Sequence, residues 1–330
     1  MEVKARGSTS ATGRRRGGPE PATGVAWSGI AARVGRMRGG AAGRGRWRRL
    51  GSGLAAAGIL ILLAACAPSG GADGPGGAEA SASGVAPTAP GIALPPAGGL
   101  PDYQLGGAYE PADEVSIVAR DRSASPAEGR YSICYVNGFQ TQPGELQDWP
   151  AELLLQRDGA PVFDPDWPDE ALLDHSTPER REAIAAIVSP WIAGCAAAGY
   201  DAVEFDNLDS YTRSRGALAL DGAVELARLL VSAAHEAGLA AGQKNAAEDA
   251  AVLRDRGGFD FAVTEECAAY AECGAYAAVY GDEVIDIEYS DELPVPFGEL
   301  CRAPGAPGSM VLRDRQLTVP GDAAYVFETC

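Results

Sequence analysis

The sequence predicts an α/β protein, a (β/α)8 TIM barrel with an irregular C-terminal segment. Three observations support this fold class. The region after residue 100 has about 230 residues, the size of one such barrel. Strand and helix patterns alternate clearly in its second half, as a parallel sheet requires. Polar side chains recur where strands end, and a barrel of this kind carries its chemistry there.

Eight stretches have the composition of strands, with β-branched and aromatic residues bounded by turn residues. They are residues 103–109, 115–119, 131–136, 171–174, a strand within 199–211, and 239–245, 259–265 and 284–289. The stretch 171–174 has the weakest pattern. Thr177 and Pro178 predict the start of a helix, as N-cap and first helical residue. Residues 294–330 show no regular pattern, and we expect their cysteines to hold them in place.

The first 65 residues differ from the rest in charge and hydropathy. They hold 12 of the 27 lysines and arginines but only two acidic residues, Glu2 and Glu20. The basic residues stop before Leu54–Ala65, an apolar run of 12 residues that is too short to span a bilayer. This order is typical of a signal peptide. Its basic region is unusually long, so Met37 is an alternative start.

Leu63-Ala64-Ala65-Cys66 resembles the bacterial lipobox. The resemblance implies cleavage before Cys66 and lipidation of its thiol, so that an exported protein is anchored to the outside of the bacterial cell membrane by lipid alone. The alternative is a plain secretory signal with an incidental cysteine. Residues 66–100, rich in Pro, Gly, Ala and Ser, predict a flexible tether, which leaves 101–330 as the folded domain.

Six further cysteines remain, and an even number in an exported chain favours disulfides. They are Cys134, Cys195, Cys267, Cys273, Cys301 and Cys330. Six cysteines allow fifteen pairings, and only the Cys267–Cys273 spacing suggests a particular one, closing a single loop. No metal or other cofactor is expected, because the chain has two histidines and no C-x-x-C motif.

The region after residue 65 carries 15 basic and 43 acidic residues, a formal charge of −28. Such a surface repels nucleic acid and anionic lipid headgroups and attracts cationic ligands. General solubility of an exported protein explains the same charge equally well. We expect no nucleic-acid partner, and we expect the domain to be a monomer.

Residues 199–211 hold four acidic or amide side chains within six residues: Glu204, Asp206, Asn207 and Asp209. Because side chains alternate along a strand, Glu204 and Asp206 are expected to project to the same side. Alone, this pattern is equally consistent with a solvated acidic turn. The other predicted strands favour a site, because they too end in polar residues that would meet on one face: Asp174, Lys244, Asn245, Glu265 and Glu288.

Three ordered motifs, residues 203–211 (VEFDNLDSY), 243–245 (QKN) and 259–267 (FDFAVTEEC), resemble glycoside hydrolase family 114, the endo-α-1,4-polygalactosaminidase-like proteins. Shorter matches are residues 103–106, 134–135, 234–235 and 287–289, and the similarity covers residues 101–317. The resemblance implies a (β/α)8 barrel that hydrolyses α-1,4-linked galactosamine polymers at internal bonds. The chain departs from the family at Phe205, often Pro, and at Thr264-Glu265-Glu266, often Asn-Glu-Gln.

Carried over by motif, Asp206 matches the catalytic nucleophile and Glu265 the acid/base. Glycosidic cleavage needs two carboxyl groups and no cofactor. The two groups are about 5–5.5 Å apart in retaining enzymes and about 6.5–9.5 Å apart in inverting ones. We expect a retaining mechanism. Lys244 is expected to hold Asp206 ionised, or only to pair structurally with Glu204 or Asp206. Glu265, if poorly solvated, is expected to have the raised pKa of an acid. Glu266 is the alternative acid.

The remaining strand-end residues are candidate substrate contacts. Acidic groups would bind an amino-sugar cation or pair with nearby arginines, and tyrosines would stack on sugar rings or pack at the rim. Glu204 and Asn207 would contact sugar hydroxyl groups or support the catalytic pair. In chain order the candidate substrate-binding residues are Tyr135, Asp174, Glu204, Asn207, Tyr211, Lys244, Glu288 and Tyr289.

The sequence therefore predicts an exported, lipid-anchored glycoside hydrolase whose substrate is a cationic amino-sugar polymer with α-1,4-linked galactosamine. Two alternatives stay open. One is a surface lipoprotein that binds a cationic polysaccharide without cutting it, and the other is a hydrolase of a different exopolysaccharide. The two candidate carboxyl groups favour catalysis, because a binding protein needs neither.

Overall fold

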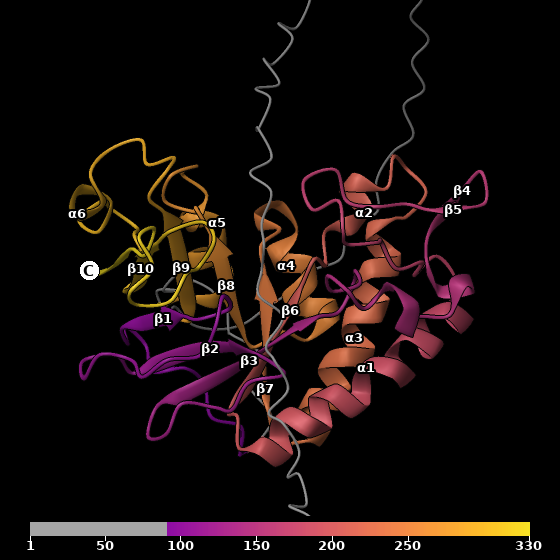
Figure 1. The fold of residues 1–330 in the computed structure, drawn as a ribbon, viewed down its shortest axis with the longest axis horizontal. Helices are drawn as coiled ribbons and strands as arrows, with labels where there is room; N and C mark the ends of the chain where they lie inside the picture. Colours follow the sequence, from indigo (N-terminus) through magenta and orange to yellow (C-terminus); the bar gives the residue numbers. More distant parts are fainter. Residues whose placement is uncertain (1–90) are drawn as a thin grey trace, which may run out of the picture.

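The structure is a computed structural model that describes residues 91–330 (Figure 1). The predicted signal peptide, Cys66 and most of the predicted tether lie outside the described residues. One sheet dominates the fold, with the order β1-β2-β3-β6-β7-β8-β9-β10-β11. Its strands are β1 (Pro101–Tyr103), β2 (Ile117–Asp121), β3 (Tyr131–Asn137), β6 (Ala202–Asp206), β7 (Ala240–Lys244), β8 (Phe261–Glu265), β9 (Val284–Tyr289), β10 (Ser309–Arg313) and β11 (Phe327–Thr329).

The first eight strands in this order are parallel and curl into a barrel, whereas β11 is antiparallel to β10. Arg313 on β10 is fully buried and closes the ring against β1. It donates hydrogen bonds to the backbone oxygen of Tyr103 and, over 3.0 Å, to Oδ1 of Asp102. The predicted (β/α)8 barrel is therefore confirmed.

Two parts of that prediction are wrong. The stretch 171–174 is no barrel strand: it makes isolated bridges, such as Gln140↔Leu172, within a long excursion between β3 and α1 (Pro178–Ala198). The eighth barrel strand is β10, in the C-terminal segment that was expected to be irregular. Residues 309–313 are buried on both faces, so they lack the alternation that marks a half-exposed strand.

The two long helices, α1 and α3, lie on one side of the barrel and pack together against β3, β6 and β7 (Figure 1). Thr177 caps α1 as predicted, since its side chain accepts a hydrogen bond from the backbone nitrogen of Arg180. The helices are α1 (Pro178–Ala198), α2 (Ser210–Arg213), α3 (Leu220–Glu236), α4 (Ala250–Val252), α5 (Cys273–Tyr280) and α6 (Phe297–Leu300). Shorter elements are η1 (Leu146–Asp148), η2 (Ala151–Leu153), η3 (Ala247–Asp249), the π-helical η4 (Leu253–Gly257), and the hairpin of β4 (Gln156–Arg157) and β5 (Ala160–Pro161).

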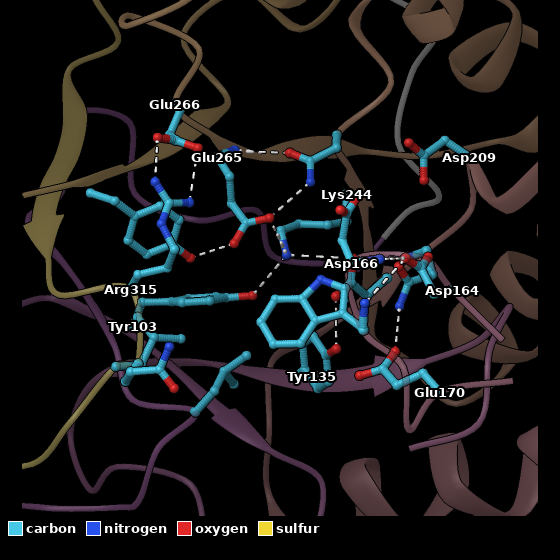
Figure 2. Close-up of a pocket in the computed structure, with 18 of the residues that line it drawn as sticks. Tyr103, Tyr135, Asp164, Asp166, Glu170, Asp209, Lys244, Glu265, Glu266 and Arg315 are labelled. Carbon is cyan, nitrogen blue, oxygen red and sulfur yellow. Dashed lines mark hydrogen bonds and ion pairs between the residues drawn. The ribbon is translucent and has the colours of Figure 1, made fainter. Parts of the chain in front are cut away.

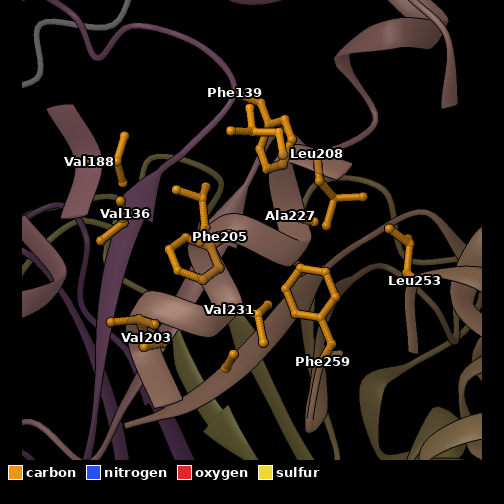
Figure 3. Packing of buried hydrophobic residues seen from close by; sticks show 14 of the residues in the cluster. Val136, Phe139, Val188, Val203, Phe205, Leu208, Ala227, Val231, Leu253 and Phe259 are labelled. Atoms are coloured by element: carbon orange, nitrogen blue, oxygen red, sulfur yellow. The ribbon is translucent and has the colours of Figure 1, made fainter. Parts of the chain in front are cut away.

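The strand β6 separates two apolar clusters. Val203 and Phe205 pack outward against the helices, as Figure 3 shows, whereas Ala202 belongs to the cluster inside the barrel. Glu204 and Asp206 therefore share the inward face, which confirms the prediction from strand alternation. The same alternation turns Lys244 and Glu265 inward. Ala240 on β7, and Phe261 and Val263 on β8, belong to the inner cluster and lie an even number of positions before them.

Residues 92–100, assigned to the tether by their composition, belong to the folded domain. Ile92 and Leu94 pack against the cluster inside the barrel. The hydroxyl group of Tyr131 also donates a hydrogen bond of 2.8 Å to the backbone oxygen of Ala93. Composition missed this segment because two apolar side chains suffice to dock it.

Three disulfides link Cys134 to Cys195, Cys267 to Cys273, and Cys301 to Cys330. The second is the pair that sequence spacing suggested. Cys267, Cys273 and Asp286 offer atoms within 4.8 Å of one another, but the two sulfurs are bonded to each other and provide no thiolate ligand. Within residues 91–330, no helix is both long and apolar enough to cross a membrane.

Candidate active site

The C-terminal ends of the barrel strands surround a cleft of about 250 Å³ (Figure 2). Six of the ten predicted site residues line it: Tyr135, Asp206, Asn207, Lys244, Glu265 and Tyr289. Both candidate catalytic carboxyl groups are among them. The two lie on one face of the barrel, as a shared role in catalysis requires.

Asp206 ends β6, and its carboxyl group is held at both oxygens. Tyr135 on β3 donates a hydrogen bond of 2.7 Å to Oδ2. The backbone nitrogen of Asn207 donates one of 2.8 Å to Oδ1. Asn207 has a φ of 62°, a left-handed conformation that asparagine tolerates better than most residues. The two hydrogen bonds fix the orientation of the Asp206 carboxyl group.

Glu265 ends β8, and its carboxyl group accepts hydrogen bonds from two neighbouring side chains. Tyr289 on β9 donates a hydrogen bond to Oε1, and the amide nitrogen of Asn245 donates one of 3.0 Å to Oε2. The amide oxygen of Asn245 accepts from the backbone nitrogen of Glu265 over 2.9 Å. Asn245 therefore fixes both the main chain and the side chain of Glu265.

Lys244 lies between the two carboxyl groups. Its Nζ is 3.5 Å from Oδ1 of Asp206 and 3.3 Å from Oε2 of Glu265, and the side chain is 2% exposed. Burial alone would lower the pKa of Lys244, but the surrounding carboxylates outweigh burial and raise it. Burial likewise raises the pKa of Glu265, but Lys244 and the bonds from Tyr289 and Asn245 reverse the effect and lower it. The expected raised pKa of Glu265 is thus wrong for the empty cleft.

The position of Lys244 also limits the separation of the two carboxyl groups. Both oxygens lie within 3.5 Å of the same nitrogen atom, so they are at most about 7 Å apart. This limit includes the whole range of retaining glycosidases, about 5–5.5 Å, and only the lower edge of the inverting range, about 6.5–9.5 Å.

Glu204 lies beneath the cleft, inside the barrel, and does not line it. Oε1 accepts a hydrogen bond from Tyr103, and Oε2 has no partner among residues 91–330. Burial raises the pKa of Glu204 to about 7, although Lys244 and Tyr103 oppose the shift. Its predicted contact with substrate hydroxyl groups is therefore excluded by burial, and support of the catalytic pair remains.

One wall of the cleft comes from the excursion between β3 and α1. Asp164 is buried there and organises the wall: Oδ1 accepts from the backbone nitrogens of Asp166 and Trp167, and Oδ2 accepts from Gln140 and Arg213. The indole of Trp167 is left 45% exposed at the cleft. A rigid turn therefore presents an aromatic face beside the exposed carboxyl group of Asp166.

Glu170 lies in the same wall, close to the catalytic floor. Oε2 accepts from the amide nitrogens of Asn137, over 3.0 Å, and Asn207, over 3.3 Å. Burial, together with the nearby charge of Asp206, raises the pKa of Glu170 to about 8. The wall therefore contains a carboxyl group that is neutral near pH 7 in the empty cleft.

The opposite wall carries Glu266, the alternative candidate for the acid. Arg315 donates to both carboxyl oxygens of Glu266, over 2.9 and 3.2 Å, and also pairs with Asp291 (Figure 2 shows the first pair). With both oxygens bonded to a guanidinium, Glu266 is poorly placed to donate a proton. The Arg315 guanidinium also lies 4.5 Å from the ring centre of Tyr289.

Three predicted substrate contacts lie away from the cleft. Asp174 accepts from Ser176 and pairs with Arg180 over 2.7 Å, so it supports the start of α1. Tyr211 donates a hydrogen bond to Asp249. Glu288 points out of the barrel and accepts from the backbone nitrogens of residues 268 and 269. We therefore remove Asp174, Tyr211 and Glu288 from the candidate binding residues.

Sequence reasoning missed the two walls. The segment Asp164–Glu170 (DPDWPDE) has an acidic and aromatic composition in a proline-rich turn, and that combination was its available signal. Arg315 follows β10, which was itself not recognised. Tyr103 was noted as a family match but not as part of a site.

A sequence profile of the glycoside-hydrolase family GH114 matches residues 82–330. The chain belongs to glycoside-hydrolase family GH114. Among solved structures, the GH114 chain is similar to Aspergillus fumigatus Ega3 in complex with galactosamine, with 23% identity over 75% of this chain and 100% of that one and a TM-score of 0.58. It is also similar to the glycoside hydrolase domain of PelA from Pseudomonas aeruginosa, with 14% identity over 68% and 98% and a TM-score of 0.44. No curated protein matches the chain.

Membership of GH114 confirms the family that the motifs resembled, and it makes the protein a glycoside hydrolase. The similarity to Ega3 agrees with the barrel fold. The roles of individual residues in the GH114 hydrolase are proposals that rest on the geometry above.

Proposed function

We propose that this GH114 hydrolase cleaves an α-1,4-linked, galactosamine-containing polysaccharide at internal bonds, with Asp206 and Glu265 as its catalytic carboxyl groups. One observation carries the proposal: both groups flank the same ammonium, that of Lys244, on the floor of one cleft. Hydrolysis of a glycosidic bond needs two carboxyl groups across that bond.

Asp206 is the proposed nucleophile. The Tyr135 hydroxyl group and the Asn207 backbone nitrogen donate hydrogen bonds to its carboxyl group, and the Lys244 ammonium lies beside it. These three contacts orient the group for attack. In a retaining reaction, Asp206 bonds to the anomeric carbon while Glu265 protonates the departing oxygen. Water then hydrolyses the resulting ester, and Glu265 takes the proton of that water.

Glu265 is the proposed acid/base. Its lowered pKa means that it is ionised in the empty cleft near pH 7. A sugar in the cleft displaces water from Glu265, and loss of solvation favours the neutral form of a carboxyl group. The proton that Glu265 donates must therefore reach it when the substrate binds.

A cationic amino sugar fits the walls of the cleft. Asp166 and Asp209 line it with Trp167. Carboxylates attract an ammonium group, and an indole face binds cations and sugar rings. The similar Ega3 structure contains galactosamine. This supports de-N-acetylated galactosamine as the sugar in the cleft.

We also propose that the protein is exported as a monomer and anchored through Cys66 to the outside of the cell membrane. Three disulfides among the described residues support export to an oxidising compartment. Mass spectrometry of the mature N-terminus should find a diacylglyceryl group on Cys66, and C66A should remove it. A mature chain without lipid would contradict the anchor.

The enzymatic proposal is tested by incubating residues 91–330 with de-N-acetylated galactosaminogalactan and measuring new reducing ends. We expect D206N and E265Q to lower the rate about 100- to 10,000-fold, as expected for lost catalytic groups. D282N, an exposed acid in the turn before β9, is the control and should retain full activity. Binding of the polymer by the parent without new reducing ends would support the non-catalytic alternative, and cleavage of only other polymers would support a different hydrolase.

A further inference from the structure

The carboxyl group of Glu204 has no part in the mechanism above, although it lies directly beneath the catalytic pair. The side chain is 0% exposed, and Oε2 has no hydrogen-bond partner among the described residues. A buried carboxylate with an unbonded oxygen is costly to keep ionised. The position therefore favours a protonated Glu204.

A hydrogen-bonded chain connects Glu204 to the catalytic acid. Tyr103 donates to Oε1 of Glu204, and the Tyr103 oxygen accepts a bond of 3.3 Å from Nζ of Lys244. The same Nζ lies 3.3 Å from Oε2 of Glu265. Tyr103 and Lys244 are both 2% exposed, so the chain is shielded from bulk water along the barrel interior.

We propose that Glu204 stores the proton that Glu265 delivers to the glycosidic oxygen, and that Tyr103 and Lys244 transfer it. This inference rests on the proposed function. The transfer requires the proton of Glu204 on Oε1, so that the bond between Tyr103 and Glu204 reverses and the Tyr103 hydroxyl group turns toward Nζ of Lys244. Lys244 then gives a proton from Nζ to Oε2 of Glu265, Tyr103 replaces it on Nζ, and Glu204 replaces the proton of Tyr103. Tyr103 and Lys244 regain their starting charges, and one negative charge moves from Glu265 to Glu204.

The neutral Glu265 then protonates the departing oxygen as the bond from that oxygen to the anomeric carbon breaks. The electron pair of Asp206 forms the new bond to this carbon. Glu204 remains ionised until water attacks the ester. Glu265 accepts the proton of that water, and the same chain returns a proton to Glu204.

The charges around Glu204 agree with a storage role. The titratable groups that face it come from five strands: Tyr103 on β1, Tyr135 on β3, Asp206 on β6, Lys244 on β7 and Glu265 on β8. Burial raises the pKa of Glu204 to about 7, whereas that of Glu265 is lowered. A single proton shared by these carboxyl groups therefore rests on Glu204 in the empty cleft.

The expected signature is in the pH dependence of kcat/KM, which reports the free enzyme. The parent should lose kcat/KM as the pH rises through about 7, because the stored proton is then lost. In E204Q the proton must bind Glu265 directly. Since the pKa of Glu265 is lowered, the alkaline limb of E204Q should move to lower pH by about one unit or more, which is tenfold or more in proton affinity.

The experiment measures reducing ends released by the full chain between about pH 4 and pH 9, for the parent, E204Q, Y103F and a control. Y103F keeps the stored proton but breaks the chain, so kcat should fall about tenfold. Because the Tyr103 hydroxyl group lowers the pKa of Glu204, its loss should move the alkaline limb of kcat/KM to higher pH, opposite to the shift in E204Q. The control is E283Q, which removes a partly buried carboxyl group before β9, outside the cleft, whose pKa burial also raises. E283Q should leave both the alkaline limb of kcat/KM and the value of kcat unchanged.

The inference would be overturned if the alkaline limb of kcat/KM lay at the same pH in E204Q as in the parent. It would also be overturned if Y103F had the kcat of the parent. A merely structural Glu204 would lower the rate equally at every pH. If E204Q does not fold, the parent profile still decides, because an alkaline limb below about pH 6 contradicts a store that titrates near 7. A parent that releases no reducing ends would instead contradict the proposed function.

Discussion

The hydroxyl group of Tyr135 donates a hydrogen bond of 2.7 Å to Oδ2 of Asp206 across two adjacent parallel strands. In the register of β3 and β6, Tyr135 is paired with Glu204, one inward-facing position before Asp206. The bond is therefore diagonal and reaches toward the mouth of the barrel. It couples the orientation of the proposed nucleophile to the packing of a neighbouring strand.

Y135F should lower kcat about tenfold with little change in KM, because a hydrogen bond to a charged group contributes about 1.5–3 kcal/mol. Steady-state kinetics on the polymer would measure it. The matched control is Y131F, which removes a tyrosine hydroxyl bonded to Ala93 at the other end of the barrel. A Y135F enzyme as active as Y131F would show that this bond does not orient the nucleophile.

K244M should lower activity at neutral pH at least about 100-fold, because it removes the charge between the two carboxyl groups. The pKa of Glu265, which Lys244 holds down against burial, should rise. Asp206 loses the same cation. K244R restores the charge and should restore part of the activity. A K244M enzyme as active as the parent would leave Lys244 a purely structural partner.

W167A should raise KM for the polymer about 3- to 30-fold and leave kcat nearly unchanged. The reason is that an aromatic contact contributes about 0.5–2 kcal/mol, and its loss affects the ground state and the transition state equally. The control is F163A, which removes a 39% exposed ring on the same segment that does not line the cleft. An equal effect of both substitutions would indicate disturbance of the segment rather than loss of a sugar contact.

Glu170 should make the folded protein less stable as the pH rises. Its folded pKa is raised from 4.5 to about 8, so the folded state holds this proton more tightly than the unfolded chain. The resulting stabilisation is complete below about 4.5 and is lost as the pH rises through about 8. Between about pH 5 and pH 8, the parent should therefore lose about 3–4 kcal/mol more stability than E170Q. Thermal unfolding at several pH values would measure this difference. The control is D166N, which changes an exposed acid of the same segment. Parallel curves of stability against pH for the parent and E170Q would contradict the prediction.

The inward position of the candidate catalytic groups could be predicted from sequence, because alternation along a strand is a local property. It placed Glu204 with Asp206, and Glu265 with the inward residues Phe261 and Val263. The same rule excludes Glu288, since Ile287 and Tyr289 on either side of it face inward. That prediction failed because the rule was not applied to β9.

Other features depended on contacts between distant segments. The eighth strand was missed because burial on both faces removes the alternating pattern of residues 309–313. The wall that carries Trp167 and Glu170 is folded by Asp164, whose partners Gln140 and Arg213 lie far away in sequence. No periodicity in the wall segment itself indicates that it returns to the barrel mouth.

The family, the barrel and two candidate catalytic carboxyl groups can be predicted from the sequence, because motifs and strand alternation are local properties of short segments. The charge states of Glu204 and Glu265 depend instead on tertiary contacts. The pKa of Glu265 is lowered and that of Glu204 is raised. The sequence had predicted a raised pKa at Glu265. The difference arises because Nζ of Lys244 lies beside Glu265, whereas Glu204 is fully buried with one oxygen unbonded among the described residues. Both are properties of the assembled barrel interior, not of either strand alone.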